Sequence, residues 1–322
     1  MEDRAAHFCR VSQQIVSSIE SVVDGQSRAV RLAVMVFLAQ GHLLIEDVPG
    51  VGKTVLAKAL ARSVGGDIRR VQFTPDLMPS DVTGVSIYDQ QTHEFRFTPG
   101  PLFANLVIGD EINRASAKTQ AALLEAMEEH QVSVDGVTHD LPMPFTVIAT
   151  QNPIELDGTF PLPEAQRDRF MARIHLGYPD LAAELTMVHD REAADPLDAL
   201  GPVVVLDEIR TMIAYARSLY VAEAVERYAL TLVRSTREHP NVRLGASPRA
   251  TLQLLRAAKV CAAMNGRNYV VPDDVASVAS PVLAHRLIAA HGWGPAHEGN
   301  EQMQGVIGEV LQATPVPRSA SA

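Results

Sequence analysis

Short apolar runs alternate with helical patterns over the first half of the chain. Two segments with helical spacing of apolar residues, Val11–Glu20 and Ser27–Gln40, come before the first short run. Gly41 is placed to end the second of these helices. A further helical pattern at 118–129 lies between two later runs. Short runs bounded by turn or polar residues are typical of buried parallel strands. The alternation predicts a doubly wound α/β domain with strands at Leu43–Ile45, Ile68–Phe73, Leu106–Ile108, Phe145–Ala149 and Ala172–Leu176.

Two segments interrupt this alternation with paired patterns of period two. Residues 86–89 and 93–98 alternate between apolar and polar side chains around a polar turn. Residues 132–134 and 138–141 flank Asp135-Gly136, a dipeptide that favours a tight hairpin turn. The sequence therefore predicts two β-hairpin insertions in the α/β domain.

The chain changes character beyond the last predicted strand. Apolar positions follow a helical period at 180–191 and again from Leu206 onward, and Pro272 with two acidic residues after it is typical of a helix start. This pattern predicts a second domain built from helices. We therefore expect an α/β domain at residues 1–200, which includes the N-terminal helical segment, and a helical domain at residues 201–322.

Composition and charge narrow the class of protein. The chain has 322 residues, of which 47% are hydrophobic, and a net charge of −10, so a basic nucleic-acid-binding groove is not expected. Cys9 and Cys261 are too few for a disulfide framework. The apolar stretch Ala33–Ala39 is too short to cross a bilayer and there is no signal-peptide pattern, so a cytoplasmic protein without membrane insertion is expected. The tail from Gly292 is expected to hold a short helix and a mobile end.

The candidate chemistry begins in the glycine-rich turn after the first predicted strand. Glycines allow backbone N–H groups to close around β- and γ-phosphates, and the dipole of the following helix adds positive potential. Lys53 supplies a cationic contact, and the Thr54 hydroxyl can ligate Mg²⁺. Asp47 stands where the strict phosphate-loop pattern has a glycine. The predicted nucleotide-binding residues of this turn are Asp47, Val48, Pro49, Gly50, Val51, Gly52, Lys53, Thr54 and Val55.

Two carboxylates, Asp110 and Glu111, end the third predicted strand. ATP hydrolysis needs one acidic group to orient Mg²⁺ and another to activate the attacking water. Because neighbouring residues of a strand point to opposite faces, we assign Asp110, with Thr54, to Mg²⁺ and Glu111 to the water. The alternative is that both carboxylates simply lie in solvent at the end of a strand and have no catalytic role. Asn152 follows the next strand and is placed either to hydrogen-bond the γ-phosphate or attacking water, or to start an Asx turn.

In their order along the chain, these segments resemble a MoxR-type AAA+ ATPase of the helix-2-insert clade. The resemblance implies an AAA+ P-loop NTPase fold, with a parallel five-stranded sheet core, two β-hairpin insertions that face a central pore and a small all-helical lid domain. It also implies that residues 22–26 touch the adenine. The motifs that carry it are Asp47–Thr54, Asp110–Ala115, Ala149–Pro153, Pro161–Phe170 and Gly245–Ala250.

The resemblance also implies roles for single residues. Asn152 would be sensor 1, Arg169 would be the arginine finger that reaches the ATP of a neighbouring subunit, and Arg249 would be sensor 2, which contacts the γ-phosphate from the helical lid. Arg167 competes with Arg169 for the finger role. Arg114 is equally an intersubunit contact or an ordinary ion-pair partner.

An arginine finger supplied by a neighbour requires head-to-tail interfaces, which close into a ring. By resemblance we expect a hexameric ATP hydrolase that uses ATP and Mg²⁺ for chaperone-like remodelling, assembly or maturation of a client protein complex, with a separate von Willebrand factor A (VWA) domain protein as partner. Two alternatives stay open. One is the motor subunit of a magnesium-chelatase-like or DNA-directed complex, and the other is an ATP-gated binding switch with little turnover.

Overall fold

A parallel sheet forms the centre of the computed structural model, which describes residues 2–48, 50–152, 160, 162–178, 196–290 and 296–317. Its strands lie in the order β2-β5-β8-β1-β9, and every neighbouring pair is parallel. The prediction of a five-stranded parallel core is therefore confirmed. The strands are β1 (Leu43–Glu46), β2 (Ile68–Gln72), β5 (Leu106–Asp110), β8 (Thr146–Gln151) and β9 (Ala172–Ile174).

Successive residues of the strands enter two different hydrophobic cores. In β1, Leu43 and Ile45 pack with the N-terminal helices, whereas Leu44 packs with the helices on the other face. Because both faces are covered, all three residues are buried and the run is continuously apolar, as in other parallel sheets. The first core contains residues of α1 (Glu2–Glu20), α2 (Ser27–Leu38) and α3 (Lys53–Ser63), and the second contains residues of α4 (Pro79–Thr83) and α5 (Ala117–Glu129).

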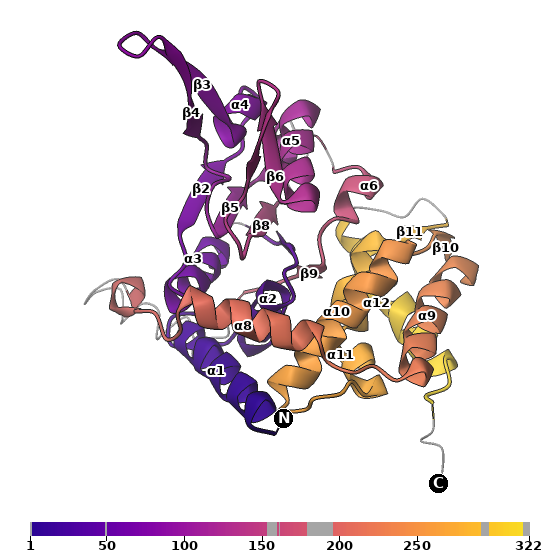
Figure 1. The fold of residues 1–322 in the computed structure, drawn as a ribbon. Coiled ribbons are helices and arrows are strands. Elements are labelled where there is room, and N and C mark those ends of the chain that lie inside the picture. The colour runs from indigo at the N-terminus through magenta and orange to yellow at the C-terminus, as the bar shows by residue number, and fades with distance from the viewer. Residues whose placement is uncertain are drawn as a thin grey trace.

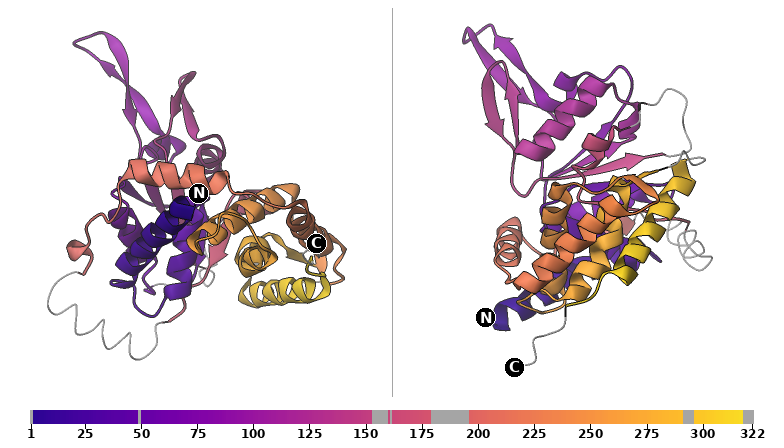
Figure 2. Two further views of the ribbon diagram at one scale, coloured as in Figure 1. Left: turned by 60° about the horizontal axis from the view of Figure 1, so that its bottom comes forward. Right: turned by 90° about the vertical axis from the view of Figure 1, so that its right-hand side faces the viewer.

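Both predicted hairpins are present and project from the α/β part, away from the C-terminal helices (Figures 1 and 2). Asp135 and Gly136 have φ angles of 52° and 80°, the left-handed pair that a two-residue hairpin turn requires. The His139 ring stacks on Phe97 with centroids 3.9 Å apart, which joins one hairpin to the other. The strands are β3 (Gly84–Asp89) with β4 (Glu94–Pro99), and β6 (Gln131–Val134) with β7 (Val137–Asp140).

The C-terminal part is helical, as predicted, with one addition. A short antiparallel pair, β10 (Val242–Leu244) and β11 (Ile288–Ala289), joins segments that are too short to give a strand pattern in the sequence. The tail contains a helix of 18 residues rather than a short one. The helix predicted at 180–191 lies outside the described residues. The helices here are α8 (Leu206–Arg217), α9 (Glu223–Glu238), α10 (Pro248–Met264), α11 (Pro272–Leu283) and α12 (Ala296–Ala313).

The C-terminal helices contact the α/β part directly. Arg256 of α10 donates to the carbonyl oxygens of Ala39 and Gln40, at 2.6 and 3.0 Å, at the end of α2. Over the described ranges, no helix combines the length and the hydropathy that crossing a bilayer requires. The remaining short helices are α6 (Glu164–Arg167), η1 (Ile112–Arg114), η2 (Pro196–Ala199) and η3 (Ala284–Arg286).

Candidate functional site

The turn between β1 and α3 has the backbone that its glycines predict. Gly50 and Gly52 have φ angles of 87° and 91°, which L side chains rarely adopt, and a Cβ at either position would meet no neighbouring atom. Glycine is therefore required at both positions because of the backbone conformation, and not because a larger side chain would clash with a neighbour. Lys53 begins α3, and Gly52 offers no side chain to cap the helix, so the first N–H groups of α3 remain available to an anion.

The other residues predicted to bind nucleotide lie in this turn and in the first turn of α3. Val51 is buried, and Val48, Thr54 and Val55 are half-buried. Pro49 lies outside the described residues. Since Thr54 lies in the first turn of α3, its hydroxyl is at the same helix end as the free N–H groups.

Asp47, which replaces a glycine of the strict phosphate-loop pattern, has a structural role that the sequence did not predict. Its Oδ2 accepts hydrogen bonds from the backbone N–H groups of Leu176 and Gly177, at 2.6 and 2.7 Å, just beyond β9. Its Oδ1 accepts from the N–H of Val48 at 2.9 Å. The carboxylate thus ties the first residues of the turn to the segment that follows the edge strand of the sheet.

Lys53 lies among three carboxylates. Its Nζ donates to the carbonyl oxygen of Asp47 at 2.6 Å. Burial lowers the pKa of the Lys53 ammonium, and the negative charges of Asp47, Asp110 and Glu111 oppose that shift. Because β1, β8 and β5 are parallel neighbours, the turn and the end of β5 lie at the same edge of the sheet, as the order of motifs in the sequence predicts.

Asp110 is buried at the end of β5 and accepts two hydrogen bonds. Its Oδ2 lies 2.6 Å from Nε of Arg70 on β2, and its Oδ1 accepts from the Thr150 hydroxyl at 3.2 Å. Thr150 also accepts a hydrogen bond of 3.0 Å from the backbone N–H of Glu111. Thr150, which sequence analysis missed, therefore joins both carboxylate residues to β8. Its only signal in the sequence is a hydroxyl directly after the apolar residues Val147–Ala149 of β8.

Glu111 leaves the strand in a left-handed conformation, with φ 55° and ψ 51°. Because of this backbone conformation, the side chain of Glu111 does not take the direction that it would have if β5 continued through it. Oε2 of Glu111 accepts from Nε2 of Gln72 at 2.9 Å and from Nη1 of Arg114 at 3.1 Å. Arg114 is thus an ion-pair partner of Glu111 within the subunit. Asn152, the predicted sensor 1, is buried directly after β8.

The two predicted phosphate-contacting arginines lie together, apart from the turn. Nε of Arg169 donates to Oε2 of Glu128 at 2.9 Å, and Nη2 of Arg249 donates to Oε1 of the same carboxylate. Arg167 makes a different set of contacts: its Nε is buried and has no hydrogen-bond partner in the described part of the chain. Burial is the main cause of the lowered pKa of His285, and the charges of Arg286, Arg173 and Arg167 add to it.

Glu128 lies at the edge of the sheet where the strands begin. The carbonyl oxygen of its neighbour Met127 is 2.9 Å from Nε2 of His42, the residue immediately before β1. The glycine-rich turn follows the other end of β1, about 13 Å away for a strand of this length. Arg169 and Arg249 are therefore held at the edge opposite the turn of their own subunit.

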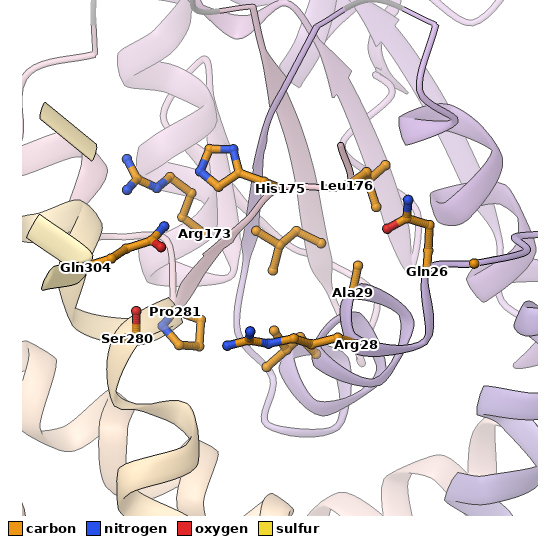
Figure 3. A pocket seen from close by; sticks show the side chains of 12 residues that line it. Gln26, Arg28, Ala29, Arg173, His175, Leu176, Ser280, Pro281 and Gln304 are labelled. Atoms are coloured by element: carbon orange, nitrogen blue, oxygen red, sulfur yellow. The ribbon is translucent and has the colours of Figure 1, made fainter. Parts of the chain in front are cut away.

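A cavity of about 330 Å³ opens beside the turn, between β9, the start of α2 and the helices α11 and α12 (Figure 3). Its wall includes Leu176, whose N–H is bound by Asp47, and His175, whose pKa is lowered mainly by burial. Gly25 and Gln26, from the segment expected to touch adenine, also line it. The remaining lining residues are Arg28, Ala29, Leu32, Arg173, Ile174, Ser280, Pro281 and Gln304.

Comparison with known proteins agrees with this architecture. Residues 42–172 match the family model described as "ATPase family associated with various cellular activities (AAA)", and residues 234–306 match an AAA lid domain. A crystal structure of a putative ATPase from Cytophaga hutchinsonii is similar to this fold, with a TM-score of 0.89, 35% identity and 98% coverage of both chains.

Curated relatives extend over nearly the whole chain. The chain is 45% identical to YeaC of Bacillus subtilis over 95% of both chains. It is 40% identical to chaperone MoxR1 of Mycobacterium tuberculosis, over 95% of this chain and 82% of the relative. It is 31% identical to protein MoxR of Paracoccus denitrificans, over 94% and 95% of the two chains. Together with the sheet order, the hairpins and the lid, these similarities show that the chain belongs to the MoxR family of AAA+ ATPases.

Proposed function

We propose that this protein binds ATP and hydrolyses it to ADP and phosphate at the turn between β1 and α3. The observation that carries the proposal is the turn with two left-handed glycines, which puts Lys53 at the start of α3, at the same edge of the parallel sheet as Asp110 and Glu111. Lys53 and the free N–H groups of α3 would hold the β- and γ-phosphates. Glu111 would act on the attacking water, and Asn152 would hydrogen-bond that water or the γ-phosphate.

The residues present also suit Mg²⁺. Magnesium prefers oxygen ligands and is usually held by one or two protein groups together with phosphate oxygens. Asp110 offers a buried carboxylate oxygen, and Thr54 offers a hydroxyl at the helix end. When bound, the ion would neutralise charge on the phosphate oxygens. Thr150 keeps the carboxylate of Asp110 in place through its hydrogen bond.

The cavity beside the turn suits the adenine base. Its volume of about 330 Å³ is in the range of small-ligand pockets, and its wall mixes apolar side chains with the amides of Gln26 and Gln304. Asp47 connects this wall to the phosphate-binding turn through the N–H of Leu176. The base and the phosphates would therefore occupy two sites that one carboxylate holds together.

Arg169 and Arg249 would serve the ATP of a neighbouring subunit. Both lie at the edge of the sheet opposite their own turn, and a protomer that carries its turn and its arginines at opposite edges is suited to a closed head-to-tail ring. We propose a hexamer. The pairing of Arg169 with Glu128 favours Arg169 over Arg167 as the finger, since Nε of Arg167 is buried.

The work that hydrolysis drives is proposed from the relatives. One relative is named as a chaperone, MoxR1. We infer chaperone-like remodelling or maturation of a client protein complex in the cytoplasm, together with a VWA-domain partner. ATP-driven movement of the lid and the hairpins would act on the client.

Turnover by the purified protein tests this function directly. Wild-type protein should release phosphate from ATP in the presence of Mg²⁺, and Lys53→Ala should lose both turnover and binding of a fluorescent ATP analogue. Glu111→Gln should bind the analogue and release almost no phosphate. Full turnover by Glu111→Gln would refute its assignment, and binding without any turnover by the wild type would favour the nucleotide-gated switch.

A further inference from the structure

Glu128 joins two arginines that come from distant parts of the chain. Arg169 follows α6 and is 41 residues from Glu128, while Arg249 is in the first turn of α10 and is 121 residues from it. Two guanidinium groups this close repel each other, because arginine stays charged at any physiological pH. A carboxylate that binds one arginine with each of its oxygens offsets that repulsion. Glu128 therefore allows the two cations to lie side by side.

A second carboxylate fixes the backbone segments that carry these arginines. Asp168, directly before Arg169, accepts hydrogen bonds of 3.0 and 2.9 Å from the hydroxyl of Ser247. It also accepts from Nε of Arg286 at 2.9 Å, and Arg286 is almost fully buried in the lid. Ser247 caps α10, so the start of the helix that carries Arg249 is bound to the residue next to Arg169.

Each arginine keeps donors for a further partner. Arg169 uses Nε for Glu128, and its terminal nitrogens Nη1 and Nη2 make no hydrogen bond to any residue that the structure describes. The side chain of Arg169 is 29% exposed and that of Arg249 is 40% exposed. A guanidinium has five N–H donors, so a bond to Glu128 orients it without using up its capacity to bind phosphate oxygens.

From this geometry we propose that Glu128 is a positioning residue for ATP hydrolysis in the neighbouring subunit. It holds Arg169 and Arg249 as a pair, so that both reach the same triphosphate from one direction. Asp168 supports the pair by joining the segment of Arg169 to the lid through Ser247 and Arg286. The inference rests on the proposed function, in which both arginines act across the subunit interface.

Mixed rings separate this role from a structural one. Recipient subunits carry Arg169→Ala and Arg249→Ala, so they bind ATP but lack both arginines. Donor subunits carry Lys53→Ala, so they do not bind ATP but still present both arginines. Each preparation alone should be nearly inactive, and mixing them should restore ATP turnover at interfaces where a recipient site faces donor arginines.

Glu128→Gln is then introduced into one subunit type at a time. In the donor it should lower the restored kcat about tenfold or more, because misplaced catalytic groups cost that much or more. In the recipient it should leave the restored kcat within about twofold, since the arginines that Glu128 would position are absent there. The recipient arm also controls for folding, because it carries the same substitution. Glu125→Gln, one turn earlier on α5 and also exposed, should have no effect in either arm.

The outcomes are distinct. Equal losses of kcat in both arms would assign Glu128 a purely structural role and overturn the inference, and so would an unchanged kcat in the donor arm. If mixing restores no turnover before Glu128 is altered, the proposal that the arginines act across the interface fails instead.

Discussion

The guanidinium of Arg70 lies 2.6 Å from the carboxylate of Asp110, measured from Nε to Oδ2. The side chain of Arg70 is 54% exposed on β2, whereas that of Asp110 is 8% exposed. Under the proposed function Asp110 helps to hold Mg²⁺, and a positive charge this close opposes the binding of a second cation. Arg70 is therefore expected to weaken the affinity of the site for Mg²⁺.

Replacing Arg70 by glutamine should lower the Mg²⁺ concentration at which ATP turnover is half-maximal. The change should be about two- to fivefold, because the Arg70 side chain is more than half exposed and solvent screening limits such a pair to about 1 kcal/mol or less. Arg69→Gln is the matched control, since Arg69 is the adjacent exposed cation on β2 and makes no ion pair with any residue in the described ranges. A rise in the Mg²⁺ requirement of Arg70→Gln would mean that Arg70 supports the site.

The Thr150 hydroxyl joins Asp110 to the backbone of Glu111, and this predicts a loss of turnover when it is removed. Thr150→Val keeps the shape of the side chain but leaves a buried carboxylate oxygen of Asp110 and the half-buried N–H of Glu111 without their partner. The kcat for ATP should fall about ten- to a hundredfold, which corresponds to about 1–3 kcal/mol for unsatisfied buried groups. Binding of a fluorescent ATP analogue to this variant should change little.

Thr146 provides the control for that experiment. It lies on the same strand and is equally buried, but its hydroxyl has no hydrogen-bond partner in the described structure. Thr146→Val should therefore keep wild-type turnover and unfold at the same or a higher temperature. Equal losses of kcat in the two variants would show that a valine in β8, and not the missing hydrogen bonds, causes the effect.

Asp47→Gly would restore the glycine of the strict phosphate-loop pattern, yet the structure predicts weaker ATP binding. The substitution removes the acceptor for the N–H groups of Leu176 and Gly177 and separates the turn from the wall of the cavity. The Kd for a fluorescent ATP analogue should rise at least about tenfold, because two hydrogen bonds to a charged group are lost. Asp47→Asn keeps one oxygen and should lie between Asp47→Gly and the wild type. Equal or tighter binding by Asp47→Gly would contradict this role.

The sequence predicts those parts of the site that lie within short segments, where the spacing of residues along the chain identifies the turn, the strand and the helix. The glycines, Lys53 and the two carboxylates at the end of β5 lie in short segments whose strand and helix patterns fix their edge of the sheet. The five strands and both hairpins follow from apolar runs and the Asp135-Gly136 turn in the same way. The roles of the individual site residues stay predictions until turnover is measured.

The residues that sequence analysis missed depend on contacts between distant segments. Glu128 is one of several acidic residues on α5, and only its approach to Arg169 and Arg249 distinguishes it. The partners of Asp47 lie 129 and 130 residues further along the chain. No pattern of period two or 3.6 encodes such an approach, because it is set by how the completed elements pack.

His42 predicts a specific dependence of stability on pH. It is fully buried, its Nδ1 accepts from the N–H of Val147 at 3.0 Å, and its Nε2 lies 2.9 Å from the carbonyl oxygen of Met127, which fixes a neutral ring. The pKa of His42 is lowered to about 4, mainly by burial and to a smaller extent by the charges of His130 and Arg256, while the hydrogen bond to the Met127 carbonyl opposes the shift. In the unfolded chain this histidine takes up a proton near pH 6.5, whereas in the folded chain it stays neutral down to about pH 4. Protonation therefore stabilises the unfolded state, and the folded state loses stability as the pH falls from about 6.5 to 4.

The free energy of unfolding should therefore be about 2 kcal/mol lower at pH 5 than at pH 7 on account of His42 alone. His42→Gln, whose amide can also accept from Val147 and donate to Met127, cannot take up that proton. Urea denaturation at the two pH values should show a smaller pH-dependent loss in this variant than in the wild type. The comparison cancels the contributions of the other buried histidines, because both proteins contain them. Parallel losses in the two proteins would show that His42 is not the group that destabilises the fold at low pH.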